Sequence, residues 1–198
     1  MCKEKLAKRG KNMKYFKKLV GDRIYLSPRN PEDYEIFTKW LNDFETTDYV
    51  DMSGQLLSLP AEKEFLESNS SPEATFSIIT LEEDRIIGSI SLEDINSKNR
   101  TATLGIFIGD TEYRSKGYGT EAIRLILEYG FKYKNLHNIK LDLMEFNERA
   151  YKCYQKCGFK EYGRRRNCKF INGKYYDQIS MDILENEFEG DFIRNKNI

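Results

Sequence analysis

The feature that most constrains the fold is an amphipathic segment, from Gly119 to about Tyr133, that lies between two β-branched segments. Its apolar residues recur every three or four positions, as on the buried face of a helix: Ala122, Ile123, Ile126, Leu127 and Phe131. The flanking segments, 102–108 and 139–144, are typical of strands. A strand, a helix and a strand in this order predict two parallel strands with the helix packed on their sheet.

The rest of the chain predicts further strands and helices around this unit. Strands are expected at 23–27, 75–81, 85–92, 159–170 and 175–183, and helices at 60–67, 148–157 and after Asn30, where Tyr34, Phe37, Trp40 and Leu41 have helical spacing. The Asn172-Gly173 step predicts a tight turn between the last two strands. Consecutive strands pair antiparallel, so the predicted fold class is α/β (mixed α+β). We expect a mixed, mostly antiparallel twisted sheet of about seven strands with about four helices.

The chain reads as one domain, because no repeat or flexible linker divides it. We expect a disordered basic leader at 1–13 (with Met13 as an alternative start), the domain at 14–184 and a charged C-terminal tail at 185–198. The apolar runs are too short for a membrane span and no signal-peptide stretch follows the leader, which favours a cytoplasmic location. The 32 basic and 32 acidic residues balance, which argues against nucleic acid or a membrane as a partner.

The cysteines and the histidine restrict the available chemistry. Without an export signal, the four cysteines are expected to be reduced thiols: Cys2, Cys153, Cys157 and Cys168. Cys153 and Cys157 have a spacing that would suit two metal ligands, but there is no CxxC pair and His137 is the only histidine. We therefore predict no metal, and a packing role for this pair. The absence of a GxSxG elbow also disfavours a Ser-His-Asp hydrolase.

The segment Arg114-Ser-Lys-Gly-Tyr-Gly-Thr120, between a strand and a helix, is the most informative for function. Its two glycines allow a sharp turn and a close approach of the backbone to a ligand. The first amides of the helix lack internal partners and lie at the positive end of its dipole. Together with Arg114 and Lys116, they predict a site for an anion such as a pyrophosphate, although a plain strand-to-helix connection is the alternative. The pattern matches neither a Walker loop nor GxGxxG.

This turn resembles the [Q/R]-x-x-G-x-[G/A] acyl-CoA motif of the GNAT superfamily. Further along, the segment from Asn147 to Phe159 resembles that family's N-x-x-A-x-x-x-Y-x-x-x-G-F pattern, at the family's spacing. Residues 170–181 resemble the closing hairpin of the branch that contains the ribosomal-protein N-terminal acetyltransferases and the spermidine acetyltransferases. The resemblance covers about 22–184 and implies the GNAT fold, with an acyl-CoA slot between the fourth and fifth strands (102–108 and 139–144).

The resemblance also implies which residues bind acetyl-CoA. The amides of the glycine turn would hold the pyrophosphate, the preceding strand would bind the pantetheine arm through its main chain, and Asn147 would contact the pantetheine side. The implied cofactor-binding residues are Ile106, Phe107, Ile108, Arg114, Ser115, Lys116, Gly117, Tyr118, Gly119, Thr120 and Asn147. Tyr154 matches a tyrosine near the thioester sulfur, and we predict it to be the general acid that protonates the leaving thiolate. A helical tyrosine packed against the sheet is the alternative.

The sequence leaves the general base open. Some relatives place a glutamate on the fourth strand for this purpose, and aligning the glycine turn puts Thr103 at that position. Either a base acts from elsewhere through water, or the acceptor amine has a low pKa. The candidate bases are Glu45, Asp51, Glu93 and His137.

The predicted function is an acetyl-CoA-dependent N-acetyltransferase in which a neutral primary amine attacks the thioester directly. The region that forms the acceptor pocket in the family, here 31–66 and 167–177, contains acids and aromatics that suit a cationic amine: Trp40, Phe44, Glu45, Asp48, Tyr49 and Asp51. A small amine of polyamine, amino-sugar or aminoglycoside type is slightly preferred. The alternatives are a protein N-terminal acetyltransferase, which needs an open cleft, and a non-catalytic acyl-CoA-binding module. The sequence leaves the oligomeric state open, and a homodimer is suggested only by analogy, because relatives are often dimers.

Overall fold

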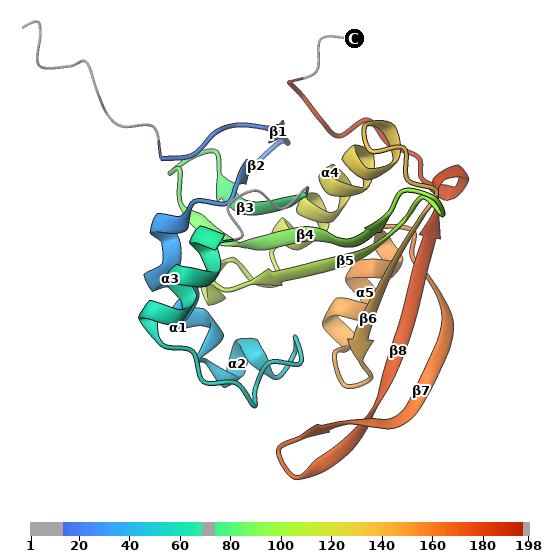
Figure 1. Cartoon of the computed structure of the whole chain (residues 1–198). Helices are drawn as coiled ribbons and strands as arrows, with labels where there is room; N and C mark the ends of the chain where they lie inside the picture. The colour runs from blue at the N-terminus through green and yellow to red at the C-terminus, as the bar shows by residue number, and fades with distance from the viewer. Residues whose placement is uncertain (1–13, 69–73, 196–198) are drawn as a thin grey trace, which may run out of the picture.

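The computed structural model describes residues 14–68 and 74–195. Within these residues the strands form one sheet of eight strands, and the helices lie on its two sides. The leader predicted at 1–13, with Met13 and Cys2, lies outside these residues. Helices α4 and α5 lie behind the sheet, whereas α1, α2 and α3 gather in front of it at one end (Figure 1). The predicted mixed α/β class is confirmed.

The sheet has the strand order β1-β2-β3-β4-β5-β6-β8-β7. Its strands are β1 (Leu19–Val20), β2 (Ile24–Pro28), β3 (Thr75–Thr80), β4 (Ile86–Asn96), β5 (Thr101–Ile108), β6 (Asn138–Met144), β7 (Lys160–Ile171) and β8 (Lys174–Leu184). Neighbouring strands pair antiparallel except for β5 and β6, which are parallel because α4 connects them. The β7–β8 hairpin extends well beyond the rest of the sheet (Figure 1).

The helices begin and end close to where their sequence signals place them. They are α1 (Tyr34–Leu41), α2 (Phe44–Thr47), α3 (Leu59–Ser68), α4 (Tyr118–Lys132) and α5 (Glu148–Lys156), with short 3-10 helices at Pro31–Asp33, Thr111–Tyr113 and Glu185–Glu187. The side chain of Asn30 caps the first of these turns by accepting from the backbone N–H of Glu32 at 3.0 Å. The apolar face predicted for α4 is buried in the main core, with Ile126 and Leu127 fully inaccessible.

Two elements were not predicted. Strand β1 is only two residues long, and it exists because Leu19 and Val20 pair with Leu26 and Tyr25 of β2. Helix α2 is a single turn, capped by Asp43, whose side chain accepts from the N–H of Glu45. Both elements are too short to give a hydrophobic period, so the periodicity predicted one strand and one helix fewer.

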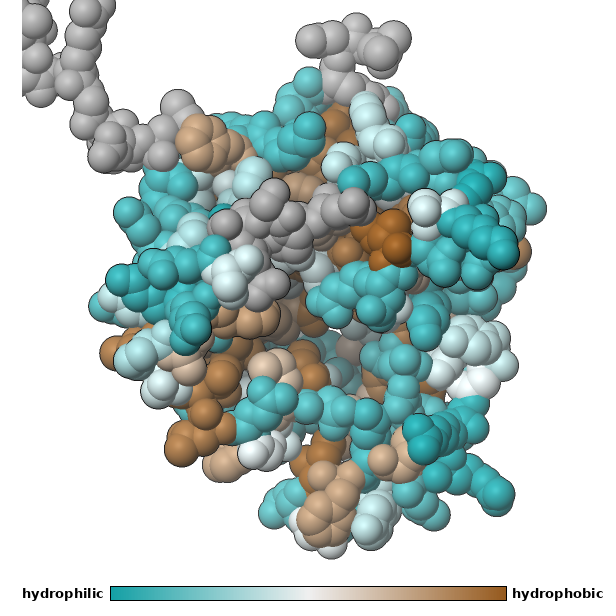
Figure 2. All heavy atoms as spheres, viewed as in Figure 1, coloured by the Kyte–Doolittle hydropathy of each residue, from teal (hydrophilic) through white to brown (hydrophobic). Residues whose placement is uncertain are grey.

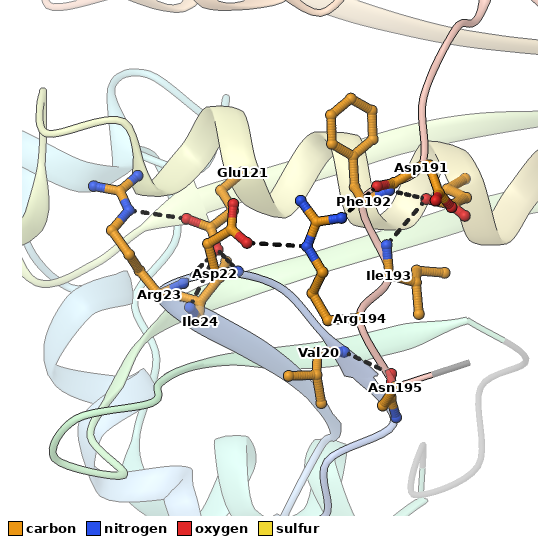
Figure 3. A network of polar contacts seen from close by, with 11 residues as sticks. Val20, Asp22, Arg23, Ile24, Glu121, Asp191, Phe192, Ile193, Arg194 and Asn195 are labelled. Carbon is orange, nitrogen blue, oxygen red and sulfur yellow. Dashed lines mark hydrogen bonds and ion pairs between the residues drawn. The ribbon is translucent and has the colours of Figure 1, made fainter. Parts of the chain in front are cut away.

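The C-terminal segment packs onto the first strand and onto α4. Its residues 191–195 run alongside β1 (Figure 3), and Ile193 is 4% exposed. The carboxylate of Glu128 on α4, itself fully buried, accepts from the backbone N–H groups of Phe192 and Ile193 at 2.5 and 3.1 Å. The N–H of Arg194 donates to the carbonyl of Val20 at 2.7 Å. Much of the segment predicted as a charged tail is therefore part of the packed domain.

The parallel pair that carries α4 opens along its length. Strands β5 and β6 are paired only where Thr101, Ala102 and Thr103 face Asn138, Ile139 and Lys140. Beyond this point β5 continues beside β4 while β6 continues beside β8. The two strands thus diverge within the sheet, and the space between them becomes available to a ligand.

The face shown in Figure 2 is mostly hydrophilic. Hydrophobic side chains gather on this face on the side of α1 and α2 and, among other places, at the tip of the β7–β8 hairpin. At the tip, Phe170 and Tyr175 are each more than half exposed and their ring centroids are 5.0 Å apart. Among the residues described, no helix combines the length and apolar character needed to cross a membrane.

Candidate active site

A cavity of about 620 Å³ lies where β5 and β6 diverge. Its lining comes from β5, β6, the glycine turn, the start of α4, the inward face of α5, the loop after α2 and the β7–β8 hairpin. The residues of the predicted site that line it are Ile106, Phe107, Ile108, Arg114, Ser115, Gly117, Gly119, Thr120, Asn147 and Tyr154. The fold thus gathers most of the predicted site residues around one space, although the sequence distributes them over three elements.

The glycine turn has the backbone geometry that its sequence suggests. Ser115 and Gly117 have positive φ angles of 60° and 88°, and α4 begins directly afterwards at Tyr118. A Cβ at Gly119 would meet only Ile108, at 3.9 Å, so space remains open beside the first turn of α4. The first amides of that turn have no partners within the helix and can bind an anion.

Two predicted site residues lie outside the cavity lining. The carbonyl of Lys116 accepts from Arg23 Nη1 at 3.0 Å, behind the turn. The ring of Tyr118 packs against Tyr113, with centroids 5.2 Å apart, and beneath the Arg23 guanidinium at 4.5 Å. Arg23 thus contacts both the Lys116 carbonyl and the Tyr118 ring, and neither residue lines the cavity.

The Arg114 side chain forms internal hydrogen bonds. Its guanidinium donates to the carbonyls of Ile108 and Gly109 on one side, and to Thr46 Oγ1 and the Glu45 carbonyl of α2 on the other. These bonds tie the glycine turn to the end of β5 and to α2. Arg114 therefore holds two walls of the cavity together, a role that the motif alone did not suggest.

Glu121 on α4 also supports the turn, and no pattern in the sequence predicts this role. Its carboxylate accepts from the backbone N–H groups of Asp22, Arg23 and Ile24 at 2.8, 2.8 and 3.3 Å, and from Arg23 Nε at 3.0 Å. Figure 3 shows Arg23 and Glu121 side by side in this network, with Asp22 linked to Arg194 of the C-terminal segment. The β1–β2 turn is thereby fixed beneath the start of α4.

We expect a Glu121→Ala variant to lower the free energy of unfolding by about 1–3 kcal/mol, because three backbone donors lose their acceptor. Alanine retains the helix propensity of α4, so the loss reports the hydrogen bonds. Urea denaturation of the full chain measures it. Glu148→Ala is the matched control, since Glu148 is 80% exposed and pairs only with Lys152, and its effect should stay under about 0.5 kcal/mol. Equal effects of the two substitutions would contradict the role assigned to Glu121 in holding the β1–β2 turn.

Helix α5 brings Asn147 and Tyr154 to the cavity. Asn147 is its N-cap, and Asn147 Oδ1 accepts from the N–H of Ala150 at 3.2 Å. Tyr154 is 9% exposed and packs edge-on against Phe159, with centroids 5.8 Å apart. Burial raises the pKa of the Tyr154 hydroxyl, so this group carries its proton at neutral pH and is a weaker acid than a solvated tyrosine.

The candidate bases separate into two groups. The carboxylates that line the cavity are Glu45, Asp51 and Asp142, the last of which accepts from Ser180 Oγ at 2.5 Å. Glu93 is outside the lining and accepts from Ser91 Oγ at 2.7 Å. His137 is 53% exposed at the start of β6, where it faces Glu185, and does not line the cavity. Thr103 does line it. In residues 14–68 and 74–195 no three potential metal ligands are grouped.

The acceptor side of the cavity is bridged by side chains from both of its walls. Tyr49, in the loop after α2, contacts Phe146 at a centroid distance of 5.7 Å, and Phe146 contacts Tyr176 of β8 at 4.8 Å. Asp51 of the same loop forms an ion pair with Lys169 of β7. Of the three aromatic residues expected in the lining, only Tyr49 lines the cavity. Trp40 is buried against Phe37 and Phe107, and Phe44 is exposed. Phe44 and Asp48 both lie outside the lining.

Comparisons with known proteins agree with this arrangement. A family model described as "Acetyltransferase (GNAT) domain" matches residues 23–160. "Probable N-acetyltransferase YjcK" of Bacillus subtilis is 31% identical over 182 residues, which cover 86% of this chain and 99% of that protein. Spermidine N(1)-acetyltransferase of Escherichia coli K12 is 37% identical over 101 residues, 51% of this chain and 54% of that enzyme. The crystal structure of spermidine N-acetyltransferase from Vibrio cholerae in complex with CoA and spermine has a TM-score of 0.77 and 28% identity, covering 83% of this chain and 96% of that one.

Proposed function

This chain belongs to the GNAT acetyltransferase family, and from this premise we propose that it acetylates a primary amine of a small cationic molecule. The donor is acetyl-CoA, and the amine attacks the thioester carbonyl directly. The observation that carries the proposal is the single cavity at the divergence of β5 and β6, which joins the glycine turn to the bridged acceptor side.

The residues around the glycine turn fit a CoA thioester. A pyrophosphate is proposed to lie on the amides from Arg114 to Thr120, where positive φ at Ser115 and Gly117 turns the backbone. The pantetheine arm is proposed to follow the diverging edge of β5 at Ile106, Phe107 and Ile108, with Asn147 opposite. Acetyl-CoA supplies the activated acyl group, and the protein supplies its orientation.

Tyr154 is the proposed general acid. When the amine attacks, the carbon–sulfur bond breaks and the sulfur leaves with an electron pair, which the Tyr154 hydroxyl proton can neutralise. The amine first loses its own proton, and the cavity carboxylates Glu45, Asp51 and Asp142 are the groups available to receive it through water. Thr103 cannot act as this base, because its hydroxyl does not ionise at neutral pH.

Two observations favour a small amine over a protein N-terminus. The contacts Tyr49–Phe146–Tyr176 and Asp51–Lys169 cross the acceptor side, whereas a protein substrate needs an open cleft there. The spermidine acetyltransferases among the relatives, by their names, act on a polyamine. Acidic lining and an aromatic ring suit a polyamine or an aminated sugar equally. A cytoplasmic location and a homodimer stay predictions.

The test is acetyl transfer to a panel of amines. The panel holds spermidine, spermine, an aminoglycoside, an amino-sugar and a peptide with a free N-terminus, and mass spectrometry follows both the acetylated amine and free CoA. Acetylation of a polyamine or amino-sugar with kcat/KM well above the peptide's supports the proposal. Preference for the peptide would instead indicate that the enzyme acetylates protein N-termini. Acetyl-CoA binding without transfer to any amine would leave only the binding module.

Lys169 provides a more specific test of the acceptor site. Its ammonium group already forms an ion pair with Asp51 in the cavity lining and therefore competes with a cationic acceptor for this carboxylate. We expect Lys169→Gln to lower the KM for a cationic acceptor about 2- to 5-fold, the effect of one half-exposed ion pair. Asp51→Asn should raise that KM by a similar factor. Steady-state kinetics at saturating acetyl-CoA measures both. Lys174→Gln at the start of β8 is the control, and a Lys169→Gln enzyme that behaves like it would refute the competition between Lys169 and the acceptor.

A further inference from the structure

Two thiols of α5 converge on the first turn of α4. Cys153 Sγ lies 3.1 Å from Thr120 Oγ1, and Cys157 Sγ donates to the Thr120 carbonyl over 3.8 Å. The two cysteines are four residues apart, so they occupy the same face of α5 in successive turns. Thr120 is part of the turn in which we propose that the pyrophosphate binds, so the sulfurs adjoin the cofactor end of the cavity.

The two thiols differ in access. Cys153 lines the cavity and is partly exposed, so a small reagent that enters the cavity reaches it. Cys157 is 7% exposed and belongs to the main hydrophobic core. An oxidant therefore meets Cys153 first and Cys157 only through Cys153.

The two thiols also differ in acidity. The neighbouring Cys157 thiol lowers the pKa of Cys153, helped by the Thr120 hydroxyl and by the charges of Lys156 and Arg124, against the opposing effect of burial. The Cys153 sulfur and burial raise the pKa of Cys157. Cys153 is therefore the more acidic of the two thiols, as an attacking cysteine must be, and Cys157 is suited to act as the resolving cysteine.

We propose that Cys153 and Cys157 form an oxidisable dithiol that reacts with a small hydroperoxide in the cavity and weakens acetyl-CoA binding when it becomes a disulfide. The Cys153 thiolate attacks one peroxide oxygen, and the O–O bond breaks. Hydroxide is the leaving group when the oxidant is hydrogen peroxide, and Cys153 becomes a sulfenic acid. The Cys157 sulfur then attacks the Cys153 sulfur, the S–O bond breaks, and water leaves with the thiol proton. The dithiol loses two electrons and the peroxide gains them.

The end of α5 can accommodate this bond. Side chains four apart in a helix have Cβ atoms about 5–6 Å apart, whereas a disulfide needs about 4 Å, so the last turn must shift. Cys157 is the C-cap residue of α5, and Gly158 follows it with φ at 98°. The disulfide removes the thiol proton that Cys157 donates to the Thr120 carbonyl and thereby alters the proposed pyrophosphate site, on which this part of the inference rests.

The first test is oxidation of the reduced full chain with equimolar hydrogen peroxide, followed by peptide mass spectrometry. We expect a Cys153–Cys157 disulfide, reversed by dithiothreitol, that forms about tenfold faster than any oxidation of Cys168, because Cys153 has a lowered pKa and a second thiol beside it that can resolve the sulfenic acid. Cys157→Ser should stop at a dimedone-trappable sulfenic acid on Cys153, and Cys153→Ser should leave Cys157 reduced. Equal oxidation of Cys153 and Cys168, or no disulfide, would overturn the proposal.

The second test is calorimetric titration of acetyl-CoA into reduced and oxidised protein after the peroxide has been removed. We expect weaker binding to the oxidised protein, recovery with dithiothreitol, and no peroxide effect in the Cys153→Ser/Cys157→Ser double variant. Equal affinities would refute the effect of the disulfide on the cofactor site. A reduced protein that does not bind acetyl-CoA would instead contradict the proposed function, while the mass-spectrometric result on the dithiol would still stand or fall by itself.

Discussion

A Gly117→Glu variant is expected to lose acetyl-CoA binding by about 100-fold or more, equivalent to at least about 2.7 kcal/mol. Gly117 has φ at 88°, where an L-residue is strained, and its Cβ would lie 3.1 Å from Arg23 Nη2. The new carboxylate would also repel a pyrophosphate at the positive end of α4. Calorimetric titration with acetyl-CoA measures the loss.

Two further variants separate the ligand effect from the backbone effect. Gly173→Glu, in the hairpin turn, has φ at 76° and open space around its Cβ, so it carries the same backbone strain far from the cavity and should bind normally. Gly119→Glu has no positive φ and faces the cavity, so it should lose binding without strain. If folded Gly117→Glu and Gly119→Glu proteins both bound like the wild type, the pyrophosphate would not lie on this turn.

A Tyr154→Phe variant is expected to lower kcat by about 100-fold or more, the effect of removing a general acid. The ring and its contact with Phe159 remain, so the core is preserved. The acetyl-CoA affinity should change little, because the lost hydroxyl acts on the leaving sulfur. The amine-dependent rate at saturating acetyl-CoA, combined with calorimetry, tests both parts.

Tyr151→Phe is the matched control on the same helix. Its hydroxyl donates to Glu161 at 3.1 Å and is not part of the cavity lining, so the rate should stay near that of the wild type. A Tyr154→Phe enzyme with the wild-type kcat would show that Tyr154 is a packing residue. Urea denaturation of both variants measures their free energies of unfolding. A difference between them would show that the Tyr154 hydroxyl also contributes to stability, and the kcat ratio would be interpreted with that contribution in mind.

The features that the sequence predicted well depend on neighbouring residues. The Asn30 cap, the buried face of α4 and the Asn172-Gly173 turn, in which both residues have positive φ, follow from local geometry. The glycine turn was recognised from its own residues, whereas the role predicted for Tyr154 came from the resemblance of a contiguous segment to the family pattern. The divergence of β5 and β6 was expected only through the resemblance to the family.

The features that the sequence did not predict depend on residues far apart. Glu121 and Arg23 are separated by 98 positions and Asp51 and Lys169 by 118, and neither pair leaves a periodic signal. Arg114 was interpreted as a charge for the ligand, but its guanidinium has four acceptors within the protein. Only the packed chain determines which of several charged side chains face a cavity and which connect its walls.

The packing of the C-terminal segment on α4 also determines when folding of the domain can be completed during protein synthesis. Phe192 and Ile193, whose N–H groups donate to Glu128, are synthesised more than 60 residues after it. The N–H of Arg194 donates to the carbonyl of Val20 in the first strand. A nascent chain that ends before these residues has the sheet and α4 but lacks the two backbone donors that Phe192 and Ile193 supply to the Glu128 carboxylate. The ribosome must therefore release nearly the whole domain before its first strand and its last segment can meet.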